Sequence, residues 1–376
     1  MDVIYTNAGK FAGAGIGFIA YQFVRAIYRA GHLQRAIVAY ATRHDLPPEK
    51  VVTFPWMRVV ARLARDNAPI RDSAFDCCAA HFISPCDIFH GWSHQCLRSL
   101  RRAKTLGAVT FVERPNSHDR TQYRLVKEEF ERWGFQGYEP VRPWGMRRGL
   151  AELEIADFIT VPSRFAYESM LAEGISEERL FLIPYGVDVN RFTPGEPPVD
   201  TFRLLFVGQV SLRKGVPYLL QAWERLSLPR AELWLAGRVT PDAQQIVARY
   251  RDHPTIRFLG HVRDIPAIYR QASVFVLPSI EEGSALVTYE AMATALPLIF
   301  TYNSGAVARD GVEGIQIPVR DVDALAAAID RLYRDPELRH EMGRAGRKRA
   351  EEYTWEAAGQ RLLAAYREAL RRGGRV

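Results

Sequence analysis

The sequence predicts an α/β protein made of two Rossmann-like, doubly wound domains that face each other across a cleft. The chain has 376 residues, more than one hydrophobic core usually organises. In both halves short β-branched runs alternate with segments of helical period, which is typical of parallel sheets wrapped by helices. The proline-rich segment 191–200 can continue neither a helix nor a central strand, so we interpret it as the interdomain linker.

The N-terminal domain is expected to span residues 1–190 and to hold the less regular of the two patterns. A helix is predicted at 17–32, where apolar residues recur at helical spacing. Strands are predicted for the apolar runs at 2–7, 35–42, 86–92, 108–115 and 157–163. These elements predict a parallel sheet whose strand ends face the cleft.

The C-terminal domain is expected to span residues 191–376. The helix after its first strand places Leu219, Leu220 and Trp223 on one face. The final helix, at about 355–372, also has apolar residues at helical spacing, and one interpretation has it packing back on the N-terminal domain. Strands are predicted at 203–210, 231–237, 255–261, 273–279, 296–302 and 314–319.

Composition limits the possible functions. Apolar residues make up 48% of the chain and charged residues 25%, as in ordinary globular proteins. The N-terminus lacks the features of a signal peptide and no apolar run is long enough to cross a membrane, so we expect a cytoplasmic protein. The formal net charge of +7 suits an anionic partner, but no nucleic-acid-binding motif is recognisable and nucleic acid is not expected.

Two glutamates, Glu282 and Glu290, flank the start of a predicted helix. This helix is expected to begin near Ala285, just after Gly283, which lets a ligand approach the backbone closely. The free N–H groups at a helix start favour an anion such as phosphate, and carboxylates on either side of it accept sugar hydroxyls. The pattern indicates a nucleotide-sugar site, with ordinary helix capping as the alternative.

Arg213 and Lys214 form a basic pair in the loop that follows the predicted strand at 203–210. On the neighbouring strand–helix turn, these side chains would neutralise the charge that develops on a leaving diphosphate. The alternative is a basic pair in a solvated surface loop.

Four blocks of sequence, at 156–195, 204–223, 281–300 and 314–356, carry a family resemblance. In their order and spacing the chain resembles the retaining nucleotide-sugar glycosyltransferases of family 4, which have the GT-B architecture of two Rossmann-like domains. The resemblance implies transfer of a hexosyl group from a nucleotide-diphosphate sugar to an acceptor hydroxyl, with the anomeric configuration kept. It implies no cofactor beyond this co-substrate.

The resemblance also implies roles for individual residues on the donor side. Glu282 would contact the donor sugar beside the reacting carbon, Glu290 would hold the ribose hydroxyls, and Lys214 matches the diphosphate lysine. Gln209 stands where the family generally has arginine, so Arg213 is expected to compensate for the missing charge. The backbone of Gly283, Ser284, Ala285 and Leu286 would line the sugar and the phosphates, and the turn near Val262 would supply backbone contacts to the base.

The N-terminal half resembles the family less closely, as expected of a domain that receives a variable acceptor. Its glycine-rich loop is spaced G-x-G-x-G, not G-x-G-x-x-G, which argues against a nicotinamide-dependent oxidoreductase. His118 is the candidate for a catalytic histidine beside the donor sugar, with His81, His90 and His94 as competitors. The expected acceptor-side residues are Gly13, Gly15, Gly17, Arg114 and Asn116.

No tightly bound metal is expected. The pair Asp321 and Asp323 has the spacing of a metal motif, but it opens a predicted helix, where the carboxylates cap and stabilise the N-terminus.

The acceptor is taken to be a glycan, a lipid-linked sugar or a small molecule. Two other functions stay open: a sugar phosphorylase with an orthophosphate site, and a catalytically silent nucleotide-sugar-binding protein.

A basic segment follows the predicted strand at 86–92. Its pattern favours either a solvated helix face or an interfacial helix that contacts anionic lipid at the inner face of the membrane. The basic residues are Arg98, Arg101, Arg102 and Lys104, and the apolar residues between and before them are Trp92, Leu97 and Leu100.

Overall fold

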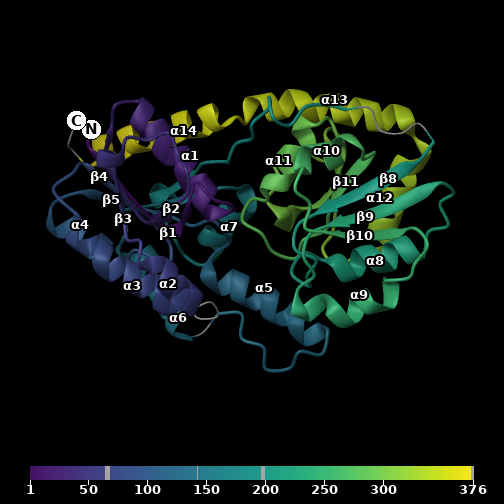
Figure 1. Cartoon of the computed structure of the whole chain (residues 1–376), viewed down its shortest axis with the longest axis horizontal. Coiled ribbons are helices and arrows are strands. Elements are labelled where there is room, and N and C mark those ends of the chain that lie inside the picture. The colour runs from purple at the N-terminus through teal and green to yellow at the C-terminus, as the bar shows by residue number, and fades with distance from the viewer. Residues whose placement is uncertain (64–67, 142, 196–199, 374–376) are drawn as a thin grey trace.

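The computed structural model describes residues 1–63, 68–141, 143–195 and 200–373, which form two α/β domains placed end to end along the long axis of the molecule (Figure 1). The N-terminal sheet is parallel, with strand order β3-β2-β1-β4-β5-β6-β7. Its strands are β1 (Val3–Phe11), β2 (Leu33–Ala41), β3 (Val51–Thr53), β4 (Ile88–Trp92), β5 (Val109–Glu113), β6 (Phe158–Val161) and β7 (Leu180–Leu182). The helices are α1 (Ile16–Arg29), α2 (Met57–Leu63), α3 (Ala68–His81), α4 (Leu97–Thr105), α5 (Asp119–Arg132), α6 (Pro143–Ile155) and α7 (Arg164–Ala172).

The C-terminal sheet is also parallel, with strand order β10-β9-β8-β11-β12-β13. Its strands are β8 (Phe202–Val207), β9 (Ala231–Ala236), β10 (Ile256–Gly260), β11 (Val274–Leu277), β12 (Leu298–Thr301) and β13 (Gly314–Ile317). The helices are α8 (Val216–Glu224), α9 (Gln244–Tyr250), α10 (Ile265–Arg270), α11 (Leu286–Ala293), α12 (Val322–Arg334), α13 (Pro336–Glu352) and α14 (Trp355–Arg372).

The strand order of each sheet reverses at one point. In the N-terminal domain this point lies between β1 and β4, and in the C-terminal domain between β8 and β11. Ligands of open parallel sheets bind outside the carboxyl ends of the strands that flank such a point. The loops that follow β8 and β11 are therefore the expected ligand-binding loops of the C-terminal domain.

The fold class predicted from the sequence is confirmed, and each predicted strand is present. The pattern does not reveal β3 and β7, which have three residues each and lie at the two edges of their sheet. Part of the predicted linker, 196–199, lies outside the described residues.

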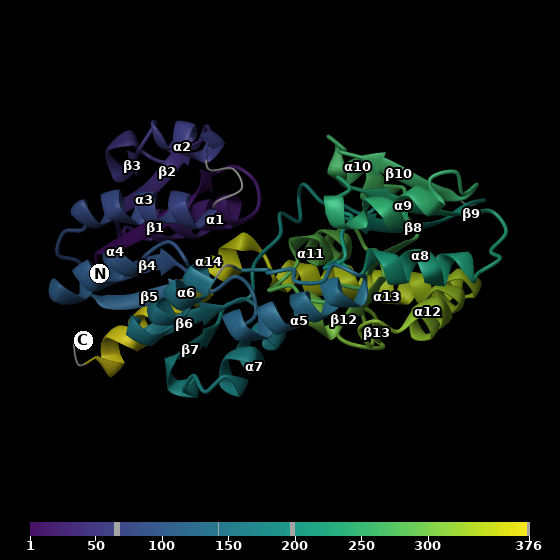
Figure 2. The same ribbon diagram turned by 90° about the horizontal axis from the view of Figure 1, so that it is seen from below.

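Helix α14 returns from the C-terminal domain and packs on the N-terminal one (Figures 1 and 2). It lies along α1, and Gly359 permits the close approach, because a Cβ there would lie 2.4 Å from the Cβ of Ala26. Further along α14, the hydroxyl of Tyr366 lies 2.6 Å from Nδ1 of His90, which is fully buried under the helix. This helix therefore completes the core of a domain to which it is not adjacent in the sequence.

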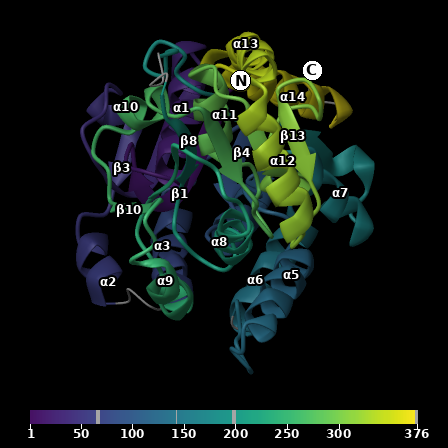
Figure 3. The ribbon, with the colours of Figure 1, turned by 90° about the vertical axis from the view of Figure 1, so that its right-hand side faces the viewer.

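Helix α5 connects the two domains on the side opposite α14 (Figures 1 and 3). Its Glu129 is fully buried and accepts hydrogen bonds from two residues of the C-terminal domain. The hydroxyl of Tyr218 donates at 2.8 Å and Nε of Arg320 donates at 2.7 Å. Because a buried carboxylate requires such partners, this contact holds the domains together at one end of α5.

Candidate active site

The loops after β8 and β11 bring two predicted donor-side residues into contact. Lys214 lies in the loop before α8, Glu282 lies in the loop before α11, and Nζ of the lysine is 2.6 Å from Oε1 of the glutamate. Burial would raise the pKa of Glu282, but Lys214 and Arg213 outweigh it and lower this pKa below its ordinary value. The switch point of the C-terminal sheet therefore presents an ionised carboxylate paired with a cation.

Arg213 is held by a glutamate that the sequence pattern does not single out. Its Nε lies 3.0 Å from both the backbone oxygen and Oε2 of Glu281, and its Nη2 lies 2.9 Å from the same Oε2. Nη2 is also 4.0 Å from Oε1 of Glu282. The predicted basic pair is thus matched by an acidic pair, one carboxylate for each cation.

Gly283 is a point of contact between the domains. A Cβ at this position would lie 1.5 Å from the backbone oxygen of Pro115 and 2.8 Å from Cα of Asn116, so only glycine fits. Ser163, also in the N-terminal domain, donates its hydroxyl to the backbone oxygen of Gly283. The sequence suggested close approach of a ligand, whereas here the N-terminal domain itself makes the close approach.

The N-terminus of α11 offers free backbone donors next to Glu282. The N–H of Ala285 is used, because it donates to the backbone oxygen of Ser304 at 3.1 Å. The N–H groups of Leu286 and Val287 have no partner among the described residues. Ser284 is buried, and its hydroxyl is bonded to Tyr289. The N–H groups of Gly283 and Ser284 also have no partner among the described residues, but both residues are buried, so Leu286 and Val287 in the first turn of the helix are the more accessible donors for an anion.

Glu290 lies within α11, about one turn after its start, and its environment differs from that of Glu282. Burial raises its pKa, an effect that the hydrogen bond from Tyr269 at 3.0 Å partly offsets. Together with Leu286, it lines a cavity of about 610 Å³ between α1, the interdomain crossing at 186–192 and the start of α14. This cavity is large enough for part of a nucleotide.

The structure does not show the roles of Gln209 and Val262. Gln209 follows β8 and is exposed, and Val262 is half-buried in the turn after β10. The Gln209 side chain has no hydrogen bond among the described residues, and the contact expected near Val262 is from the backbone to a base, so the predicted diphosphate and base contacts stay predictions.

The glycine-rich loop between β1 and α1 is a tight turn over the end of its own strand. Gly15 caps α1 with φ of 60°. A Cβ at Gly17 would lie 2.0 Å from the backbone oxygen of Lys10, and a Cβ at Gly13 would lie 2.7 Å from the same oxygen. The turn explains these three glycines, and their contact with an acceptor stays a prediction.

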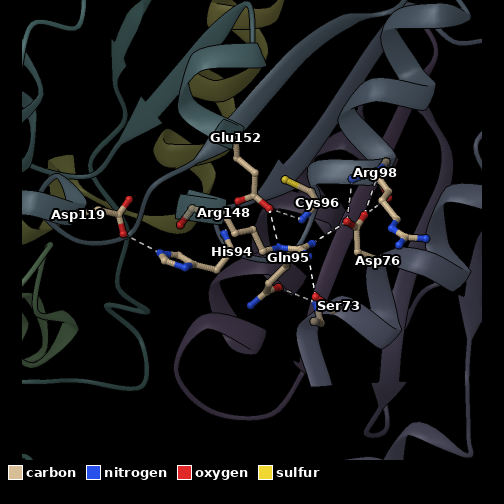
Figure 4. A network of polar contacts seen from close by, with 12 residues as sticks. Ser73, Asp76, His94, Gln95, Cys96, Arg98, Asp119, Arg148 and Glu152 are labelled. Carbon is tan, nitrogen blue, oxygen red and sulfur yellow. Dashed lines mark hydrogen bonds and ion pairs between the residues drawn. The ribbon is translucent and has the colours of Figure 1, made fainter. Parts of the chain in front are cut away.

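A buried polar network lies at the carboxyl ends of β4 and β5 (Figure 4). Nε2 of His94 lies 2.7 Å from Oδ1 of Asp119 and 3.0 Å from Nη1 of Arg114. Burial would raise the pKa of Asp119, but Arg114 and His94 outweigh it and lower this pKa to about 2. Arg114 is 2% exposed, so it positions its neighbours and does not reach into open solvent.

The histidines occupy very different positions. His118, the catalytic candidate, is buried at the N-cap of α5, where Nδ1 accepts from the N–H of Arg120 and burial lowers its pKa. Asn116, two residues earlier, is half-buried against Gly283. Of its competitors, His90 is fully buried, the side chain of His94 is 25% exposed, and His81 is exposed at the end of α3. A catalytic role for His118 stays a prediction.

Comparison with known proteins identifies the C-terminal domain. Residues 201–335 match the family model described as glycosyl transferases group 1. These residues are thus similar to the group 1 glycosyl transferases. The match contains the loops that hold Lys214 and Glu282, so the domain identified is the one that carries the predicted donor side.

Curated relatives agree with this assignment over part of their length. The chain is 30% identical over 270 residues to an MMP alpha-(1->4)-mannosyltransferase of Mycolicibacterium hassiacum, covering 68% of this chain and 64% of that protein. It is 32% identical over 223 residues to a D-inositol 3-phosphate glycosyltransferase of Thermobifida fusca, covering 52% and 51%. The chain therefore spans about half to two thirds of the length of these relatives.

Solved structures confirm the GT-B fold of both domains together. A sucrose-phosphate synthase from Thermosynechococcus elongatus matches with a TM-score of 0.72 at 21% identity, covering 99% of this chain and all of that one. Anabaena HepE, solved with UDP-glucose, matches with a TM-score of 0.68 at 15% identity, covering 98% and 100%. The predicted resemblance to nucleotide-sugar glycosyltransferases is confirmed.

Two negative findings apply to the described ranges. Within residues 1–63, 68–141, 143–195 and 200–373, no group of three His, Cys, Asp or Glu side chains is placed to hold a metal ion. In the same ranges no helix has the length and apolar character needed to cross a membrane.

The helix cap predicted at the start of α12 is confirmed, since Asp321 accepts from the N–H of Ala324 at 2.8 Å.

Proposed function

We propose that this protein transfers a glycosyl group from a nucleotide-diphosphate sugar to an acceptor hydroxyl with the anomeric configuration kept. The observation that carries the proposal is the ion pair of Lys214 and Glu282 beside the free N–H groups of Leu286 and Val287, at the switch point of the sheet. A cation and a helix N-terminus together suit a diphosphate, and a carboxylate beside them suits a sugar. The relatives' names support the same reaction class.

The donor and the acceptor are proposed by chemistry. HepE was solved with UDP-glucose and the relatives act on mannosyl and inositol phosphate compounds by name, which supports a nucleotide-sugar donor and a polyol acceptor. Glu290 would face the ribose from the cavity that it lines. Acceptors bind on the N-terminal side in this proposal, near His94 and Asn116.

In the reaction, the bond from the sugar to the diphosphate breaks and a carbocation-like sugar forms. Lys214, Arg213 and the N-terminus of α11 would stabilise the departing diphosphate. Glu282 would stabilise the sugar, because its lowered pKa keeps it ionised at neutral pH. The acceptor hydroxyl attacks from the face that the diphosphate leaves and passes its proton to a diphosphate oxygen. Because side chains supply the positive charge, we propose that no bound metal is required.

A thermal-shift screen tests the donor site. UDP, GDP, ADP and their sugar conjugates are added to the purified protein, and a nucleotide that binds the folded state at 100 times its Kd should raise the melting temperature by about 2 °C or more. The shift is expected to disappear in Lys214→Ala and to persist in Lys348→Ala, whose lysine is exposed on α13. A shift of equal size in both variants would show that the nucleotide binds elsewhere.

The two alternative functions, a sugar phosphorylase and a silent nucleotide-sugar-binding protein, predict different results when orthophosphate is added to the same screen. A sugar phosphorylase would be stabilised by orthophosphate and by no nucleotide. A silent binding protein would be stabilised by one nucleotide sugar, but would neither transfer nor hydrolyse its sugar over long incubation. The intact pair of Lys214 and Glu282 favours the transferase.

We also propose that the N-terminal domain contacts an anionic membrane surface, such as the inner face of a cell membrane. The structure corrects the expected geometry: Trp92 and Leu100 are buried, so the apolar residues around α4 face the core. Exposed apolar side chains come instead from α2, α3 and α6: α3 and α6 pack against α4, and α2 packs against α3 (Figure 2). The exposed apolar residues are Trp56, directly before α2, and Val59, Leu63, Ile70 and Trp144 on these helices. The exposed basic residues are Arg58 and Arg62 on α2, Arg98, Arg101 and Arg102 on α4, and Arg147 on α6.

Vesicle sedimentation tests the membrane contact. Leu63 is 84% exposed, so its substitution by Glu should leave folding unchanged and weaken binding to phosphatidylglycerol vesicles about tenfold. The matched control is Val312→Glu on the C-terminal domain, where Val312 is 40% exposed. Equal binding of wild type to phosphatidylcholine and phosphatidylglycerol vesicles, or no effect of Leu63→Glu, would contradict the contact.

A further inference from the structure

Glu281 is a fully buried carboxylate at the boundary between the domains. It lies between β11 and α11, directly before Glu282, and the sequence pattern gives it no role. A buried ionised side chain is costly unless its oxygens are well partnered. The identity of its partners therefore indicates what Glu281 does.

Each oxygen of Glu281 reaches across the domain boundary. Oε1 accepts from the hydroxyl of Ser117 at 2.7 Å and from its backbone N–H at 3.2 Å. Oε2 accepts from Nε2 of Gln122 at 3.3 Å, and from Nε and Nη2 of Arg213 at 3.0 and 2.9 Å. Ser117 and Gln122 belong to the N-terminal domain and Arg213 to the C-terminal one. One carboxylate thus joins both domains to a donor-side cation.

The shape of the boundary shows that this contact is closely fitted. Next to Glu281, Gly283 packs so tightly on Pro115 that a methyl group would not fit between them. If the domains separate, Glu281 loses the donors of Ser117 and Gln122 and keeps only Arg213. The carboxylate would then become open to water, and its grip on Arg213 would weaken because water screens the pair.

The orientation of Arg213 matters because of what lies beside it. Its side chain is 33% exposed, and Nη2 is 4.0 Å from Oε1 of Glu282. Glu282 in turn holds Lys214. Glu281 therefore fixes the orientation of Arg213, the cation next to the ion pair of Lys214 and Glu282. Glu281 itself is buried and is not placed to touch a diphosphate.

The hydrogen bonds of Glu281 continue through Gln122 to the proposed acceptor side of the cleft. Oε1 of Gln122 accepts from Nη2 of Arg114 at 2.8 Å, and Nη1 of Arg114 lies 3.2 Å from Oδ1 of Asp119. A continuous set of buried polar contacts thus connects the His94 network to Arg213 through Glu281. Glu281 is thus one of the residues that join the two halves of the site, together with Gly283 and Ser163.

We propose that Glu281 is a positioning residue that ties closure of the two domains to the orientation of Arg213. The proposal rests on the proposed function, since it concerns the cations of the same site. It predicts that a residue of the N-terminal domain, Ser117, affects the donor side, although the only hydrogen bonds it makes to the C-terminal domain among the described residues are those to Glu281.

A double-mutant cycle on kcat tests the coupling. Ser117→Ala removes one hydrogen bond to a charged group and is expected to lower kcat about tenfold, and Glu281→Gln about 100-fold. The double variant should be no slower than Glu281→Gln, because Ser117 acts through Glu281. Effects that multiply to about 1,000-fold would overturn the proposal. Ser84→Ala, in the same domain but away from the boundary, is the control and should keep the wild-type rate.

Small-angle X-ray scattering supplies a readout that needs no activity. Ser117→Ala and Glu281→Gln should each increase the radius of gyration relative to wild type, with unchanged melting of the C-terminal domain. An unchanged radius in both variants would overturn the proposal. If wild type bound no nucleotide, the proposed function would fail, whereas the scattering result would still decide whether Glu281 holds the domains together.

Discussion

Lys214→Ala is expected to lower kcat for glycosyl transfer by about 100- to 1,000-fold, the usual effect of removing one preorganised group that stabilises developing negative charge. Lys214 stands 2.6 Å from Glu282 and beside the free N–H groups of α11, where a diphosphate would leave. The alanine variant also leaves Glu282 with only Arg213 at 4.0 Å. Initial rates at saturating donor would measure the effect.

Lys348→Ala is the matched control for this prediction. Lys348 is exposed on α13, away from both loops of the site, so the variant should transfer at the wild-type rate. A Lys214→Ala enzyme that keeps more than half of the wild-type kcat would show that the lysine does not face the leaving group.

Arg148→Ala is expected to give the largest loss of stability, about 3–5 kcal/mol in the free energy of unfolding. Arg148 lies between two fully buried carboxylates in the network of Figure 4. Its Nη2 is 2.6 Å from Oδ2 of Asp76 and its Nε is 3.2 Å from Oε1 of Glu152. The variant leaves both carboxylates buried without their cation. Urea unfolding at neutral pH would measure the loss.

The pH dependence of this loss gives a sharper test. Burial raises the pKa of Glu152 to about 7, against an ordinary value of 4.5. A folded-state pKa above the unfolded value means that the contribution of Glu152 is full below the unfolded pKa and is lost as pH rises through about 7. Without Arg148, an ionised Glu152 is costlier still. The deficit of Arg148→Ala should therefore be larger at about pH 8 than at about pH 6.

A second substitution isolates the glutamate. In Arg148→Ala combined with Glu152→Gln, the residue at 152 no longer titrates, so the deficit should change little between about pH 6 and about pH 8. A deficit in Arg148→Ala that is the same at both pH values would mean that Glu152 does not titrate in this range.

The fold could be read from the sequence because strands at the centre of a parallel sheet are continuous apolar runs. β8 and β11 are of this kind, with runs of buried residues. β3 and β7 could not be found, since each pairs on one side only and is too short to show a pattern. The sequence pattern also could not show that the apolar face of α4 is buried, because periodicity does not say whether that face meets the core or a membrane.

The candidate site was predictable only where its residues follow a strand directly. Lys214 and Glu282 lie in the loops after β8 and β11, Glu290 lies in the helix that follows the second loop, and their local spacing predicts a shared ligand. Glu281 could not be assigned, because its partner Ser117 is 164 residues away and only the packing of the two domains joins them. The same reason hides the contact of Gly283 with Pro115.

The most direct test is a crystal structure with the nucleoside diphosphate that raises the melting temperature most. We predict the diphosphate at the N–H groups of Leu286 and Val287, with Lys214 turned from Glu282 to a phosphate oxygen and the ribose on Glu290. A nucleotide bound away from the loops after β8 and β11, with the pair of Lys214 and Glu282 intact, would contradict it.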